Sequence, residues 1–220
     1  MNFRDWGSAL ILLAMWYLPD RTSRRTVAGV HIRVITQYSP AAEARFLDSI
    51  VAAIELIERT DPSRLPYMRL HFRGVLVSEY PLGPIGSFSN TLRLCIVAPR
   101  YLDRGPGPAS IACTLVHETM HARVRAARIK SDRYTERIER LCVAAEIGFA
   151  KRLGNARAIL REARARQLSI ADLYCPTSLV EAELRAIQTW TGFRWMQRSM
   201  HRKATRRLER LQRGTSNEQN

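Results

Sequence analysis

The alternation of apolar and polar residues predicts the elements of the N-terminal half of the chain. Residues 30–36 alternate in the way that is typical of a strand. Ser39 and Pro40 then supply a helix cap and a first-turn proline, and the helix is expected to run to about Arg59 with apolar residues at helical spacing. Two further strand regions are expected at residues 67–77 and 91–97, with a loop between them at residues 81–86.

The C-terminal half carries a mainly helical pattern. No Gly or Pro occurs from residue 109 to residue 130 and apolar residues recur there at helical spacing, so we expect a long helix with Ser110 as its cap. Further helices are expected over residues 134–146 and 156–167, and a last one from about Leu179. The pattern as a whole predicts an α+β fold, in which a small N-terminal mixed sheet with helices is followed by a helical C-terminal half.

The long helix contains the sequence His117-Glu118-Thr119-Met120-His121. Residues four apart lie one turn above each other on a helix, so the two imidazoles can converge on one cation. Glu118 lies a little way round the helix and can reach a water molecule bound to that cation. The whole chain has only five histidines, which makes a chance match rare. The alternative interpretation is that both histidines simply pack in the helix without a metal.

This motif resembles the HExxH signature of the zincin metallopeptidases. A catalytic zinc ion usually has three protein ligands, so a third ligand is required. The metzincin branch would have Gly at position 124 and His at position 127, whereas this chain has Val124 and Ala127. The resemblance therefore implies the gluzincin branch, in which a Glu of the following helix completes the site. Three residues of that helix are candidates: Glu136, Glu139 and Glu146.

Helix geometry ranks these candidates. Glu139 and Glu146 project in nearly the same direction but lie about 10 Å apart along the axis, so only one of them is expected to bind the ion. If the first helix continues about one and a half turns past His121 before the chain reverses, Glu139 returns to the level of the histidines. We therefore predict a Zn²⁺ site formed by His117, His121 and Glu139. Glu146, and after it Glu136, are the alternatives.

The resemblance also implies the chemistry of the site. Zinc would activate a water molecule, Glu118 would act as the general base, and a peptide bond of a peptide or protein substrate would be hydrolysed. It further implies that a sheet edge, expected at residues 88–97, binds the substrate backbone by strand addition. Tyr101 and Tyr134 are the candidates for stabilising the oxyanion.

Other histidines and the cysteines are interpreted mainly as structural. His31 and His71 lie in expected strands. The four cysteines form no CxxC pair and no clear secretory leader precedes them, which indicates reduced thiols in a cytoplasmic protein. Cys113 and Cys142 flank the predicted site, where a ligand role for either is a minor alternative.

One domain is expected over residues 27–213. An apolar segment and a basic linker precede it at residues 1–26, and a disordered tail follows at residues 214–220. The apolar run at residues 6–18 is shorter than the roughly 20 residues that span a bilayer. We interpret the run as part of the core, with peripheral membrane association through an interfacial anchor as the alternative.

The charge of the chain suggests a second class of function. The formal net charge is +15, from 35 Lys and Arg against 20 Asp and Glu, which favours attraction to nucleic acid or another anionic surface. Many of these cations lie in the expected final helix, between residues 198 and 213, where they form either a solvated face or a phosphate-binding one. The alternative function is therefore a nucleic-acid-associated basic protein with a structural or degenerate zinc site. The oligomeric state is not readable from these patterns.

Overall fold

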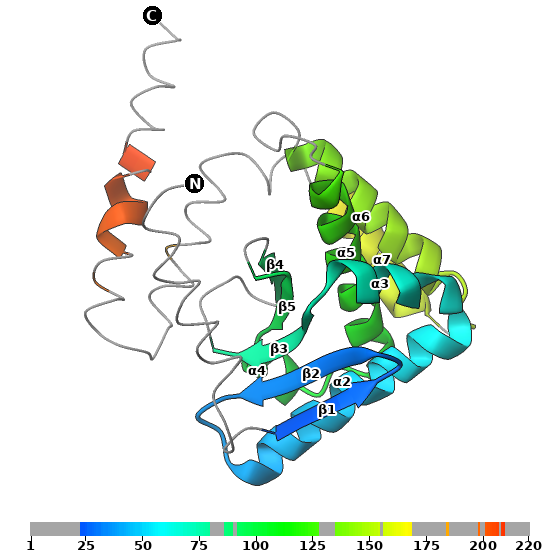
Figure 1. Ribbon diagram of the computed structural model, residues 1–220. Coiled ribbons are helices and arrows are strands. Elements are labelled where there is room, and N and C mark those ends of the chain that lie inside the picture. The colour runs from blue at the N-terminus through cyan, green and yellow to red at the C-terminus, as the bar shows by residue number, and fades with distance from the viewer. Residues whose placement is uncertain are drawn as a thin grey trace, which may run out of the picture.

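The expected α+β fold is confirmed by a computed structural model of the chain (Figure 1). The residues that the structure describes are 23–79, 86–89, 92–127, 135–154, 156–168, 184, 198, 201–206 and 208–209. The apolar N-terminal run, Tyr134, the C-terminal tail and most of the expected final helix lie outside these residues. Within them, no helix combines the length and the apolar character that crossing a bilayer requires.

A five-stranded mixed sheet forms one layer of the fold. Its strands, in the spatial order β1-β2-β3-β5-β4, are Ser23–Val27 (β1), Val30–Ile35 (β2), Gly74–Ser78 (β3), Leu94–Val97 (β5) and Gly86–Ser89 (β4). The three central strands are parallel, whereas β1 and β4 pair antiparallel at the two edges. Every residue of β3 and β5 is buried, which explains why their sequences are continuous apolar runs.

The long helices pack beside the sheet and on one another. Helix α2 (Pro40–Thr60) lies against β1 and β2, and α5 (Pro108–Ala126) lies against α2, β4 and β5. Helix α6 (Thr135–Ala150) packs on α5, and α7 (Arg157–Leu168) packs on α6 (Figure 1). Three short elements complete the fold: η1 (Pro62–Arg64), α3 (Leu65–His71) and α4 (Pro99–Asp103). The helix with the HExxH sequence is thus placed between the sheet edge and α6.

Helix α2 forms where its cap and apolar spacing predict it. The Ser39 Oγ atom accepts a hydrogen bond from the backbone N–H of Ala42 at 3.3 Å, and Pro40 occupies the first turn. Ile50, Ile54 and other residues at helical spacing are fully buried against the sheet and α5. The predicted start and end of this helix are confirmed to within a residue or two.

The predicted strand over residues 67–77 is wrong in its first part. Residues Leu65–His71 form α3, and only residues from Gly74 onward enter the sheet. A proline in the first turn favours the helix, and the alternating pattern did not reflect burial, because Leu70 is 63% exposed. His71, which we expected on a strand, therefore lies at the end of a helix.

Three other expectations need correction. The expected edge at residues 88–97 is divided, because β4 is the edge strand and β5 lies inside the sheet. Residues 23–26, assigned above to a linker, belong to β1, which pairs with β2. Helix α5 begins at Pro108 after Gly107, so Ser110 is not its cap, although its end at Ala126 agrees with the expected one and a half turns past His121.

Asp61 is a buried carboxylate that ties the end of α2 to two other elements. It accepts hydrogen bonds from Ser63 Oγ at 2.6 Å and from Arg64 Nε at 2.7 Å, and it also pairs with Arg152, just after α6. Burial raises the pKa of Asp61, but the hydrogen bonds from Ser63 and Arg64 and the charges of both arginines lower it, and the net shift is downward. The carboxylate is therefore stabilised in its charged form.

We expect Asp61→Asn to lower the free energy of unfolding by about 1–3 kcal/mol at neutral pH, because the buried group that binds Arg64 and Arg152 loses its charge. A carboxylate with a lowered folded-state pKa contributes stability above its unfolded pKa of about 3.9, and this contribution is lost as the pH falls through the folded pKa. Urea unfolding of both proteins should therefore show a difference that shrinks in acid. A difference that does not change with pH would contradict this role.

Candidate metal centre

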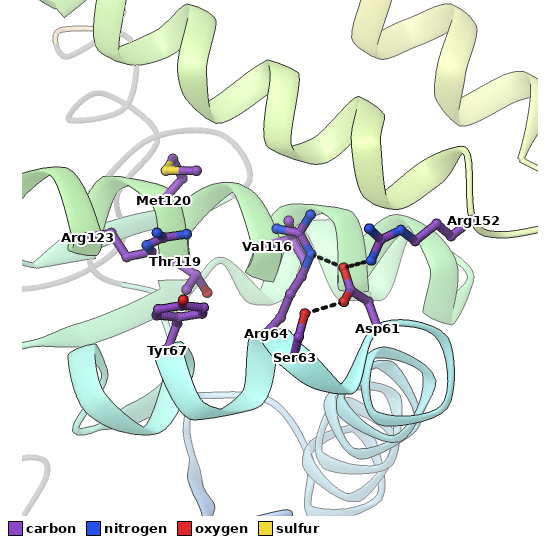
Figure 2. A pocket seen from close by; sticks show the side chains of 9 residues that line it. All are labelled: Asp61, Ser63, Arg64, Tyr67, Val116, Thr119, Met120, Arg123 and Arg152. Carbon is purple, nitrogen blue, oxygen red and sulfur yellow. Dashed lines mark hydrogen bonds and ion pairs between the residues drawn. The ribbon is translucent and has the colours of Figure 1, made fainter.

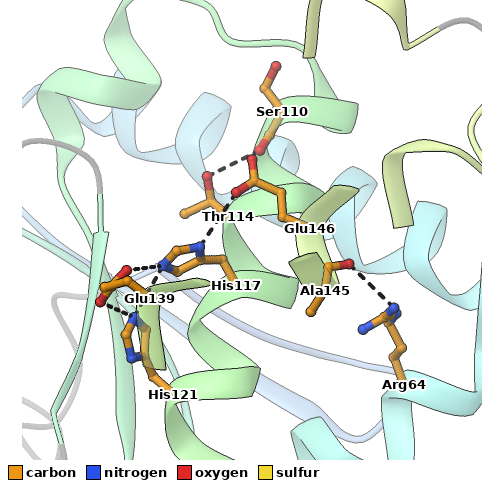
Figure 3. A network of polar contacts seen from close by, with 8 residues as sticks. All are labelled: Arg64, Ser110, Thr114, His117, His121, Glu139, Ala145 and Glu146. Carbon is orange, nitrogen blue, oxygen red and sulfur yellow. Dashed lines mark hydrogen bonds and ion pairs between the residues drawn. The ribbon is translucent and has the colours of Figure 1, made fainter. Parts of the chain in front are cut away.

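Two imidazoles of α5 face each other on the side of the helix that packs against α6 (Figure 3). The Nε2 atoms of His117 and His121 lie 3.1 Å apart, as expected for residues one turn apart on a helix. The His117 side chain is 11% exposed and that of His121 is 25% exposed. The pair is therefore nearly enclosed by protein, and it is more open to solvent at His121.

The carboxylate of Glu139 lies across both of these nitrogens. Its Oε1 atom is 3.0 Å from His121 Nε2, and its Oε2 atom is 3.4 Å from His117 Nε2. The Glu139 side chain is only 7% exposed. The structure thus brings together the three residues that we predicted as zinc ligands from the sequence.

Glu146 reaches the same histidine from the other side. Its Oε2 atom lies 3.5 Å from His117 Nδ1, so the two carboxylates of α6 contact opposite nitrogens of one ring (Figure 3). A carboxylate at the outer nitrogen of a metal-binding histidine orients the ring and raises its basicity. We considered Glu146 only as an alternative ligand, and the structure places its carboxylate at Nδ1 of His117, on the other side of the ring from Glu139. The spacing of two helical turns from Glu139 was the signal that could have indicated this.

Glu136 lies outside the site. It is on the exposed part of α6, where its Oε1 atom accepts hydrogen bonds from Arg140 Nε at 2.9 Å and from a terminal guanidinium nitrogen at 2.7 Å. Glu136 therefore pairs with an arginine of its own helix.

A cysteine also lies at the histidine pair. One potential ligand atom from each of His117, His121 and Cys142 falls within 4.8 Å of the others, and this largely buried group could hold a metal ion. Burial, followed by the nearby charges of Glu139, Glu118 and Glu146, raises the pKa of the Cys142 thiol. Because thiolates are the form that binds metals, binding of an ion through Cys142 would release the proton of this thiol.

The donor atoms at Glu139 lie close enough together to meet one ion. Zinc binds nitrogen and oxygen at about 2.0–2.2 Å, so neighbouring donors of a tetrahedral site lie about 3.3–3.6 Å apart. The two Nε2 atoms lie 3.1 Å apart, and the two oxygens of Glu139 lie 3.4 Å from His117 Nε2 and 3.0 Å from His121 Nε2, so two of these distances are a few tenths of an ångström below that range. The Oε2 atom of Glu139 is buried and has no hydrogen-bond partner among the described residues, although His117 Nε2 is near. A cation between these atoms would satisfy it.

The cluster shares a proton when no cation is present. Burial lowers the pKa of His117, but the carboxylates of Glu139 and Glu146 raise it to about 10. Burial raises the pKa of Glu139, but the two histidines lower it to about 2. A cation must therefore displace a proton from His117 at neutral pH, which is the usual coupling between metal binding and proton release.

Glu118 is buried and interacts electrostatically with both histidines. Its exposed fraction is 6%. Burial raises the pKa of Glu118, the positive charges of the histidines lower it, and the charges of Glu139 and Glu146 raise it. The net shift of the pKa is upward. The charge of Glu118 contributes, after burial, to the raised pKa of the Cys95 thiol in β5. It contributes in the same way to the raised pKa of the Cys142 thiol in α6, so the carboxylate acts electrostatically on both the sheet and α6.

Comparisons with family models, curated proteins and solved structures find no match. The interpretation of the site rests on its residues and their geometry.

Tyr101, one of the two candidates for oxyanion stabilisation, is half-buried. Its hydroxyl forms a hydrogen bond with Thr114, which lies one turn before His117 on α5. Cys113, the other cysteine that we expected near the site, is buried in the main core.

Proposed function

We propose that this protein is a zinc-dependent metallopeptidase. The observation that carries the proposal is the Glu139 carboxylate, which lies 3.4 and 3.0 Å from the facing Nε2 atoms of His117 and His121. Two imidazoles and a carboxylate are a ligand set for catalytic zinc, whereas Mg²⁺ and Ca²⁺ favour oxygen ligands alone. Three protein ligands also leave a fourth position for water or substrate.

Each residue of the site has a distinct role in this proposal. His117, His121 and Glu139 hold the ion, which supplies Lewis acidity by polarising the scissile carbonyl and lowering the pKa of water to about 7. Glu118 accepts a proton from the attacking water on its carboxylate and delivers it to the leaving nitrogen. The raised pKa of Glu118 lies closer to neutral pH than that of an ordinary carboxylate, which favours both accepting and donating the proton. Glu146 keeps the His117 ring in position through Nδ1.

The substrate backbone is proposed to pair with β4. This strand is the sheet edge next to α5. Phe88 of β4 is directly opposite Cys95 of β5, and the charge of Glu118 helps to raise the pKa of the Cys95 thiol. An extended peptide added along this edge would pass near the Glu118 carboxylate. Strand addition gives main-chain affinity without requiring a particular side chain.

A second function is supported by Cys142. With a thiolate as a fourth protein ligand the site would be closed, which is typical of structural zinc. The protein would then be a nucleic-acid-associated factor that uses its net charge of +15 to bind phosphates. A steep fall of DNA affinity with increasing salt would favour this function, and failure to bind DNA at low salt would exclude it.

Single substitutions of Glu139 and Cys142 separate the two functions. We expect Glu139→Ala to lose zinc after dialysis, whereas Cys142→Ala should keep both zinc and peptide hydrolysis, because His117, His121 and Glu139 still provide three protein ligands. Elemental analysis of the purified full-length proteins measures the first effect, and a fluorogenic peptide library measures the second. Thermal unfolding of each variant checks that it is folded.

Loss of zinc from both variants would overturn the catalytic proposal. If Cys142→Ala loses zinc as Glu139→Ala does, the cysteine is a fourth protein ligand and the site is of the closed type. Replacing zinc by cobalt gives an independent reading, since an intense thiolate-to-cobalt absorption band appears only when Cys142 is bound. Glu136→Ala is the matched control, because this residue is on the same helix but pairs with Arg140.

A further inference from the structure

A polar cavity lies on a different face of α5 from the two histidines. It has a volume of about 170 Å³, and the residues that line it come from the end of α2 with η1, from α3, from α5 and from the turn after α6. Figure 2 shows Arg123 and Tyr67 at one end, Asp61 and Arg152 at the other, and Arg64 between them. Since a water molecule occupies about 30 Å³ of liquid, the cavity has room for a small polyatomic ion.

The charges that line this cavity are not balanced. Three guanidinium groups face it, from Arg64, Arg123 and Arg152, and Asp61 is the single carboxylate in the lining. Asp61 binds the arginines at one end, through Arg64 Nε at 2.7 Å and through Arg152. The cavity wall therefore carries an excess of two positive charges, which attracts an anion.

Arg123 is the main candidate for binding an anion in this cavity. No ion pair is found for it within the part of the chain that the structure describes, and its guanidinium lies over the Tyr67 ring at 4.1 Å from the centroid. Stacking on an aromatic face holds the planar group in place and leaves its edge N–H donors available. Its charge reaches its neighbours: burial lowers the pKa of His71, and the charges of Arg123 and Arg93 lower it further.

Arg64 is held by protein on one edge and faces the cavity with the other. Its Nε atom donates to Asp61, one terminal nitrogen lies 3.5 Å from the carbonyl oxygen of Ala145, and its guanidinium carbon is 5.9 Å from the centre of the Phe149 ring. A guanidinium has five N–H donors, so these contacts do not use them all. A side chain fixed in this way binds an anion with little further loss of conformational freedom.

We propose that this cavity binds a phosphate group, with Arg123 and Arg64 as the donors and Asp61 as the residue that positions Arg64. A phosphate monoester or inorganic phosphate carries a charge of about −1.5 to −2 at neutral pH, which matches the excess of two positive charges. Planar guanidinium groups suit its oxygens because they donate two parallel hydrogen bonds. The site does not depend on the zinc proposal, because none of its lining residues is a proposed metal ligand.

Phosphate titrations of the full-length protein test this site. Inorganic phosphate replaces chloride at constant ionic strength, and we expect a saturable increase in melting temperature. Glycerol phosphate in a parallel titration distinguishes the source: tighter binding of the ester identifies an organic phosphate ligand, and equal affinity identifies the free ion. We expect Arg123→Gln to weaken phosphate binding about 10–100-fold, as loss of a charged hydrogen-bond donor predicts. Arg123→Lys should lose less, since it keeps the charge but not the planar fork.

Arg59→Gln is the matched control, because this exposed arginine of α2 is not part of the cavity lining. It should bind phosphate as the wild-type protein does. An absent or non-saturating response of the wild-type protein would overturn the proposal. So would an equal response of the wild-type and Arg123→Gln proteins, because phosphate would then be bound elsewhere, including at the zinc ion.

Discussion

Replacing Glu118 by Gln is expected to abolish most peptide hydrolysis without releasing zinc. The amide has nearly the shape of the carboxylate but cannot accept a proton from water, and general acid–base catalysis typically contributes about 10²–10⁴-fold to the rate. Glu118 is not among the donor atoms that meet at the histidine pair, so the ion should remain bound. The measurement is the turnover of a fluorogenic peptide substrate, with the zinc content of the same sample determined in parallel.

Two comparisons make this result decisive. Glu136→Gln alters an exposed glutamate that is paired with Arg140, and it should leave turnover unchanged. Because Glu118 is buried with a raised pKa, the Gln variant is also expected to fold at least as well as the wild-type protein. Undiminished hydrolysis in Glu118→Gln would remove the residue from the mechanism.

Loss of a histidine should have the largest effect on the metal. We expect His121→Ala to reduce the zinc content from about one ion per chain to near zero after dialysis, because only two protein ligands remain. His121 is the better choice for this test, since its side chain is more exposed than that of His117, and the cavity left by the substitution is less damaging to the fold. Elemental analysis together with circular dichroism separates loss of metal from unfolding.

Glu146→Gln provides a graded comparison to the histidine variant. It removes the carboxylate from His117 Nδ1 and leaves the three proposed ligands in place. Losing such an orienting partner typically lowers metal affinity by about 10–100-fold, so zinc should still bind at full stoichiometry in zinc-rich buffer. His31→Ala is the control, because this histidine contacts Thr26 on the β1–β2 hairpin. If that variant also loses zinc, the assignment of the site is wrong.

The elements that the sequence predicted well are those with a strong local signal. The Ser39 cap and the apolar spacing of α2 act within one helix, and they predicted it closely. The strand β1 was missed because its sequence is polar and its central three residues are exposed. The turn that follows it, Ala28 and Gly29 with φ of 48° and 75°, lacks the Asn or Asp that usually marks such a hairpin.

The site was predictable as far as helix geometry reaches. Spacing along α5 was enough to pair the two histidines, and spacing along α6 limited the choice to a few glutamates. Which of these glutamates meets Nε2 and which meets Nδ1 depends on how the two helices pack against each other, and packing of that kind is set by the whole core. The same is true of Cys142, whose approach to the histidines follows from its place on α6 one turn after Glu139.

The contacts of Glu139 and Glu146 with His117 have a consequence for how a metal ion would be bound. Carboxylates at both nitrogens prevent the imidazole from flipping, because a flipped ring would present carbon atoms to Glu139 and Glu146. The ring orientation is therefore set during folding and does not wait for the ion. Unlike a zinc finger, whose folding requires its metal, this protein is expected to keep its fold under chelation and to reload zinc without refolding.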